Sequence, residues 1–315
     1  MIVTLTLNPS LDVRYDAGAI RLGEVNQVRQ VRHRAGGRGL AVARLLTTFG
    51  HDVVAAGLAG GSAGEEIRAE LARDGVATQF TRISAESRRV VRIAGGPAGG
   101  GQVTAFEEPA PYITTEELGR LAADYRGLLD GATAVVLCGG LPAGLPADIY
   151  GSLTSYAAGA GVPVVLDAGG SALRHGAARG PALVVPDLAA GEPVPELPGR
   201  SSLVLPWGHG VRVLTAAGEW RACSGAGLTG PEAAVVPEAA ATPDPAVVPG
   251  SAGSSAGFRD ALVAGLTPGV ALSWSWPDML RHAVALASSV SADGEADLRA
   301  YESLLPEVAV TCPRT

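Results

Sequence analysis

The sequence predicts an α/β fold in which a mainly parallel sheet is covered by helices on both faces. Two observations lead to this prediction. Short continuous apolar runs, such as residues 2–7 and 134–138, are typical of strands that are buried on both faces. These runs alternate with longer segments of helical periodicity, and parallel strands joined by crossover helices produce that alternation.

The elements follow in chain order. The first predicted strand, residues 2–7, ends at Asn8-Pro9, and a helix that begins at Leu40 ends at Gly50. Further strands are predicted at residues 53–58, 134–138, 163–167, 183–186, 203–205 and 211–214. Further helices are predicted at residues 63–74, 114–130, 149–160, 259–266 and 280–290. Residues 224–256 are rich in Ala, Pro, Gly and Ser, so we expect a long loop there.

Two segments, residues 12–34 and 88–108, are β-like but lie outside the α/β alternation. Within the second, residues 90–93 and 102–106 flank a Gly-rich turn, which indicates a hairpin. We therefore expect these two segments to form a small separate sheet.

The composition excludes several classes of protein. Of the 315 residues, 47% are hydrophobic and 17% are charged, which is typical of a chain with a full core. The net charge of -7 argues against a general nucleic-acid binder, which needs a basic face. No apolar run approaches the ~20 residues that cross a bilayer, and residues 1–5 do not resemble a secretory signal. The three cysteines lack metal-type spacing, so a reducing cytoplasm is the simplest compartment. From charge, hydropathy and cysteines together we expect a cytoplasmic protein with no nucleic-acid or membrane partner.

The first candidate site is the sequence Ala-Gly-Gly-Arg-Gly at residues 35–39, directly before a predicted helix. Glycines let backbone amides approach an anion, and the helix N-terminus favours negative charge. Arg38 can pair with a phosphate or a carboxylate; the alternative is a plain Gly-rich turn. All 24 basic residues of the chain are Arg, so any role usually given to Lys falls here to a planar guanidinium.

Together with its neighbours, this segment resembles the N-terminal half of the ribokinase-like (PfkB-type) carbohydrate kinases. Within them it is most similar to the branch of 1-phosphofructokinase and tagatose-6-phosphate kinase. That branch carries Thr-Leu-Asn-Pro-Ala-x-Asp and Ala-Gly-Gly-Lys-Gly-x-Asn-Val-Ala. Here residues 6–12 read Thr-Leu-Asn-Pro-Ser-Leu-Asp, and residues 35–43 read Ala-Gly-Gly-Arg-Gly-Leu-Ala-Val-Ala. Residues 137–144 and 183–187 also resemble the family's Ser-Gly-Ser-Leu-Pro-x-Gly and Leu-x-Lys-Pro-Asn segments.

The resemblance implies one ribokinase-like domain over residues 1–315. Its fold would be a three-layer sandwich with a mainly parallel central sheet and a small β lid, formed by about residues 12–34 and 88–108. It also implies an ATP- and Mg²⁺-dependent kinase that phosphorylates a hydroxyl of a phosphorylated ketohexose or a related alcohol. Since the family's lid often forms a dimer contact, we expect a homodimer through the lid.

The family's site residues can be carried over position by position. Asp12 would accept hydrogen bonds from sugar hydroxyls, and Gly36 and Gly37 would let the sugar lie against the backbone. Arg38 takes the place of a Lys that helps to hold the substrate phosphate, and Arg88 would be a second cation from the lid. On the nucleotide side the resemblance implies four residues, namely Asp187, Gly208, Gly210 and Gly257. It assigns no metal ligands.

The family's last signature, Gly-Ala-Gly-Asp, opens a helix whose amides stabilise the transferred phosphoryl group and whose Asp accepts a proton. Three alignments of residues 250–260 with this signature are open. The preferred one makes Asp260 the base, because residues 260–265 resemble the family's Asp-Ser/Ala-x-Val-Ala-Gly helix without gaps. The other two place Ala252 or Ser254 at that position, and neither side chain can replace a carboxylate.

Four of the departures from the family pattern replace a polar side chain by an apolar one. Ala41 and Val90 stand where sugar-binding Asn residues are expected, Val185 replaces a Lys, and Ala190 replaces an acidic residue that helps to organise Mg²⁺. These changes favour an alternative function, in which a catalytically impaired homologue acts as a sugar-phosphate binder, a regulator or a dimeric scaffold.

Overall fold

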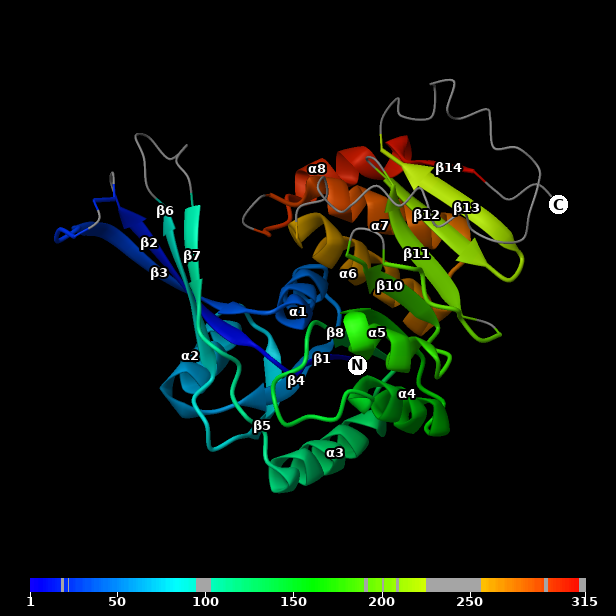
Figure 1. Cartoon of the computed structure of the whole chain (residues 1–315). Coiled ribbons are helices and arrows are strands. Elements are labelled where there is room, and N and C mark those ends of the chain that lie inside the picture. The colour runs from blue at the N-terminus through cyan, green and yellow to red at the C-terminus, as the bar shows by residue number, and fades with distance from the viewer. Residues whose placement is uncertain are drawn as a thin grey trace.

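The computed structural model describes residues 1–17, 20–21, 23–94, 103–189, 192–199, 201–207, 210–224, 256–291 and 294–311. Its central sheet contains β1 (Ile2–Thr6), β4 (Val53–Ala59), β5 (Ala77–Arg82), β8 (Ala134–Cys138), β9 (Val164–Gly169), β10 (Leu183–Asp187), β11 (Ser202–Trp207), β12 (Gly210–Thr215), β13 (Gly218–Cys223) and β14 (Ala309–Thr311). The strand order is β14-β13-β12-β11-β10-β9-β8-β1-β4-β5 (Figure 1).

The central sheet is parallel from β5 through β11 and antiparallel from β11 to β14. The predicted α/β fold with a mainly parallel sheet is therefore confirmed. Because parallel strands end on the same edge, the carboxyl ends of β1, β8, β9 and β10 meet there. The loops that follow these strands can bring distant residues together at that edge.

Helices cover both faces of the central sheet. They are α1 (Arg38–Thr48), α2 (Gly61–Arg73), α3 (Thr115–Leu129), α4 (Ile149–Gly159), α5 (Gly170–Ala177), α6 (Ala256–Leu272), α7 (Trp276–Ser289) and α8 (Leu298–Leu304). One hydrophobic core is packed by α1, α2, α6 and α7, and the other by α3, α4 and α5. Alternate strand residues enter opposite cores, as Val135 and Val136 do, which gives three layers.

A second sheet of four strands projects from the body beside α2 (Figure 1). It consists of β2 (Ser10–Ala17), β3 (Val28–Gly36), β6 (Arg88–Ala94) and β7 (Val103–Glu107), in the order β3-β2-β6-β7. The antiparallel pairing of β6 with β7 is the hairpin expected from the sequence. Strand β3 leads directly into α1, so this sheet adjoins the glycine loop at residues 36–37.

Local chemistry explains where several helices begin and end. Thr114 and Glu117 form a reciprocal capping box at the start of α3, as the Thr-Thr-Glu-Glu sequence suggests. Helix α6 is longer than expected, because it continues through Pro268 to Leu272. The predicted loop at 224–256 lies mostly outside the described residues, since the structure describes only Ser224 and Ala256 of it.

Candidate functional site

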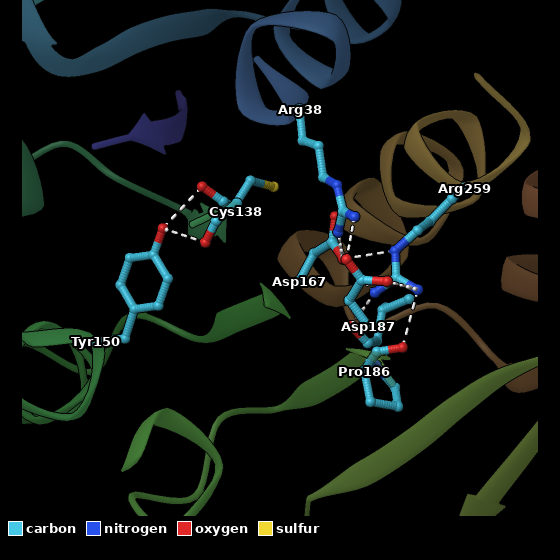
Figure 2. Close-up of polar contacts among 9 residues, drawn as sticks. Arg38, Cys138, Tyr150, Asp167, Pro186, Asp187 and Arg259 are labelled. Carbon is cyan, nitrogen blue, oxygen red and sulfur yellow. Dashed lines mark hydrogen bonds and ion pairs between the residues drawn. The ribbon is translucent and has the colours of Figure 1, made fainter. Parts of the chain in front are cut away.

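Two arginines and two aspartates form a cluster at the carboxyl edge of the central sheet (Figure 2). Asp167 lies on β9 and is fully buried, and Asp187 ends β10. Arg38 begins α1, and Arg259 lies in the first turn of α6. Asp167 Oδ1 accepts three hydrogen bonds: from Arg38 Nη1 at 3.1 Å and from Arg259 Nε and Nη2 at 2.8 and 2.5 Å. Arg38 also donates to Asp187, so it bridges the two strand ends.

Arg259 fastens α6 to the sheet. Besides Asp167, its guanidinium donates to the backbone carbonyls of Val185 at 2.6 Å and Pro186 at 2.8 Å. Strand β11 pairs with β10 at Leu183 and Val184, before β10 reaches these two carbonyls. Arg259 therefore supplies donors to the end of β10, and it is only 9% exposed.

Asp260, the predicted base, is the fifth residue of α6 and is 8% exposed. Its pKa is raised to about 8, first by burial and then by the Asp167 carboxylate, while Arg38 and Arg259 oppose the shift. Its Oδ1 and Asp167 Oδ2 are buried without a hydrogen-bond partner among the described residues. At neutral pH Asp260 therefore carries a proton. Ala252 and Ser254, the alternative positions for the base, lie outside the described residues.

The glycine loop and Asp12 lie against each other. Gly36 ends β3, and a Cβ atom added there would lie 2.3 Å from Asp12 Oδ1. Gly37 has a φ of 126°, which L side chains rarely adopt, and it precedes α1 as its N-cap. Ser10 Oγ donates to Asp12 Oδ1 at 2.7 Å, and Arg92 pairs with the other carboxylate oxygen. Only glycine at position 36 leaves room for this arrangement.

One face of the small sheet is rich in arginine. The strand register places five arginines on the same face as Asp12, namely Arg14, Arg32, Arg34, Arg88 and Arg92. A cavity of about 700 Å³ is lined by Asp12 and four of these arginines, by Arg44 of α1, by the carboxylates Glu70 and Asp74, and by residues 294–296. The predicted Arg88 does not line this cavity and pairs instead with Glu107 at 3.5 Å.

The family motif predicts only Arg88 of this face, whereas in the structure Arg92 pairs with Asp12. Arginines at every second position, as at 32 and 34, were the available signal, because alternate strand residues share a face. The sequence also does not predict a role for Asp167, or that the Arg259 side chain points toward the central sheet.

The predicted nucleotide-side residues are not all brought together. Asp187 belongs to the arginine cluster, and Gly257 in the first turn of α6 lies near Gly294. Gly210 begins β12, where an added Cβ would lie 2.1 Å from the carbonyl oxygen of Ala222. Strand pairing thus accounts for this glycine. Gly208, like Ala190, lies outside the described residues.

The residues at the carboxyl edge do not fit a metal ion held by the protein. Asp167 and Asp187, the carboxylates of the arginine cluster, are already paired with Arg38 and Arg259. Across the described part of the chain, no group of three or more His, Cys, Asp or Glu side chains could hold a metal. A divalent cation at this edge would therefore have to displace two guanidinium groups from the two carboxylates.

Comparison with known proteins assigns the family. The model of the pfkB family of carbohydrate kinases matches residues 6–189. The crystal structure of a possible 1-phosphofructokinase from Thermotoga maritima is 21% identical, with a TM-score of 0.75, and 99% of each chain is covered. Phosphofructokinase-2 from Escherichia coli in complex with fructose-6-phosphate is 21% identical, with a TM-score of 0.76, over 97% of this chain and 98% of that one. The chain belongs to the pfkB family, and it is a sugar kinase, a phosphotransferase with an alcohol group as acceptor.

None of the helices among the described residues is long and apolar enough to cross a membrane.

Proposed function

We propose that this sugar kinase transfers a phosphoryl group from ATP to a hydroxyl of a phosphorylated ketohexose, in the manner of a 1-phosphofructokinase. The observation that carries the proposal is the arginine-lined cavity beside Asp12. A carboxylate suits sugar hydroxyls, and guanidinium groups suit a phosphate, which they can bind through two parallel hydrogen bonds. Both kinds of group line one cavity of about 700 Å³, a volume ample for a hexose phosphate.

Each part of the site has a proposed role. Gly36 and Gly37 let the sugar approach the backbone, and Asp12 accepts hydrogen bonds from its hydroxyls. Asp260 accepts the proton of the attacking hydroxyl, which requires its carboxyl to be ionised. Because the pKa of Asp260 is about 8, the proposed reaction is fastest in mildly alkaline solution. Mg²⁺ is proposed only as a companion of the nucleotide phosphates, and no step is assigned to it.

The test is ATP turnover in the presence of Mg²⁺ with fructose 1-phosphate, tagatose 6-phosphate and, as a control, unphosphorylated fructose. We expect turnover with at least one phosphorylated sugar and little with fructose. Asp260→Asn should lower kcat by about 10²–10⁴-fold. Arg92→Ala should mainly raise KM for the sugar phosphate, while Arg120→Ala on the distant helix α3 should change neither constant.

A second candidate is a sugar-phosphate binder without catalysis. The observation that favours it is the neutral state of Asp260 at pH 7, together with the pairing of Arg38 and Arg259 to carboxylates. Titration calorimetry with fructose 1-phosphate distinguishes the two functions. Binding without ATP turnover at any pH between 6 and 9 would support the second candidate and contradict the proposed reaction of the 1-phosphofructokinase type.

A further inference from the structure

Arg259, the residue directly before Asp260, makes extensive polar contacts in the candidate site. Arg259 makes four hydrogen bonds of 2.5–2.8 Å, two to Asp167 and two to the carbonyls of Val185 and Pro186. These bonds fix the first turn of α6 in two directions, toward β9 and toward β10. Since Asp260 is the next residue of the same turn, its position is fixed with them.

Asp167 is the other half of this arrangement. Its Oδ1 is saturated by guanidinium donors, but within the described part of the chain its Oδ2 is buried without a partner, as is Oδ1 of Asp260. A buried carboxylate with an open oxygen favours a proton on any carboxyl nearby. The charged and titratable groups that act on Asp260 are Arg38 of α1, Asp167 of β9, Arg259 of α6 and the Cys138 thiol of β8.

We infer that Arg259 and Asp167 are a pair of positioning residues: Arg259 locks Asp260 in place, and the two residues together set the pH at which Asp260 becomes a base. This inference rests on the proposed function, because it concerns Asp260 as the base of that reaction. In the pair, Arg259 favours the ionised carboxylate of Asp260 and Asp167 favours the protonated form. The two residues therefore act on the same proton with opposite signs.

Because Arg259 and Asp167 shift the titration of Asp260 in opposite directions, measuring both shifts distinguishes this role from a purely structural one. The Asp260 side-chain carboxyl is followed by ¹³C NMR on protein labelled at aspartate, and its resonance is assigned by its loss in Asp260→Asn. We expect a midpoint near pH 8 in the wild-type protein. Asp167→Asn should move the midpoint down by about one pH unit or more, and Arg259→Met should move it up.

Two further variants guard against misfolding. Arg259→Met/Asp167→Asn removes both charges, so neither is left buried without its partner, and its midpoint should lie between those of the single variants. Arg259→Lys keeps the positive charge and should stay closer to wild type than Arg259→Met does. Arg120→Ala, which removes an ion-paired helix arginine remote from the site, is the matched control and should not move the midpoint.

The same variants should shift the acidic limb of the pH profile of kcat/KM in the same directions. NMR midpoints that stay within about 0.3 pH unit of wild type in both single variants would overturn the inference, whether or not the enzyme turns over. Midpoints that move in opposite directions support it even if no sugar phosphate is phosphorylated. In that case only the proposed function fails, because the NMR measurement requires no substrate.

Discussion

The proton on Asp260 links a single residue to the stability of the protein. The folded protein holds this proton up to about pH 8, whereas an unfolded chain releases it near pH 4. The stability that the neutral carboxyl contributes is therefore fully present below about pH 4 and is lost as the pH rises to 8. The loss approaches about 1.4 kcal/mol per pH unit in that range.

Asp260→Asn should remove this pH dependence. Its free energy of unfolding relative to wild type should rise from pH 5 to pH 8 and then level off, because asparagine stays neutral throughout. Urea denaturation at pH 5, 7 and 9 measures the difference. Parallel pH curves for the two proteins would show that the carboxyl is already ionised in the folded state.

Single residues also show where sequence reasoning about the site stopped. Asp12, Gly36 and Asp260 are predicted as site residues because each stands in a short motif. Asp167 was not found, since it ends an ordinary apolar strand and its partner Arg259 lies 92 residues further along the chain. The direction of Arg259 depends on the carbonyls at the end of β10, which become neighbours only when the sheet is formed.

At the scale of elements, the pairing of β1 with β4 depends on one glycine. Gly57 lies opposite Thr6, has a φ of 144°, and a Cβ atom there would lie 1.9 Å from the carbonyl oxygen of Thr6. Gly57→Ala must push the two central strands apart, so we expect a loss of about 3 kcal/mol or more in the free energy of unfolding.

Gly50→Ala is the matched control for that prediction. Gly50 also has a positive φ, 78°, but nothing lies within 4 Å of the added Cβ, so only the backbone conformation is penalised. We expect a cost of about 1 kcal/mol. Thermal or urea denaturation measures the loss of unfolding free energy in each variant. Equal losses would mean that β4 shifts to accommodate the added Cβ atom without a cost in free energy.

The elements that the sequence predicted are those with strong hydrophobic patterns. The buried parallel strands and the long amphipathic helices fall in this group. Strand β5 is not predicted because four of the six residues in Ala-Thr-Gln-Phe-Thr-Arg are polar, and α5 and β14 are not predicted because they are short. The end of α6 was placed too early because of Pro268. In the structure the hydroxyl of Thr267, the preceding residue, donates to the Val263 carbonyl at 2.7 Å within the continuing helix.

At the scale of the whole molecule, the small sheet has two different faces. The face with Asp12 is cationic, whereas the opposite face carries Val31 and Phe106, which are 51% and 58% exposed. Exposed apolar side chains on a projecting sheet are typical of an interface. They support the homodimer through this sheet that the family resemblance leads us to expect.

We propose a homodimer through this face, in which Phe106→Asp should leave the protein monomeric, because a charge in an apolar interface must be desolvated. Sedimentation velocity at micromolar concentration measures the change. Leu298→Asp, which alters an exposed apolar residue on α8, should leave the dimer intact. A monomeric wild-type protein, or a dimer that survives Phe106→Asp, would contradict the proposed interface.

The Arg38–Asp167–Arg259 cluster also has a consequence for the order in which the chain folds. The bonds that Arg38 and Arg259 donate to Asp167 close loops of 129 and 92 residues, and closing such loops is entropically costly until the sheet exists. The cluster should therefore form after the folding transition state. Substitutions in it should accelerate unfolding while leaving the refolding rate nearly unchanged. A chain still emerging from the ribosome has no complete site until the segment with Arg259 has been synthesised.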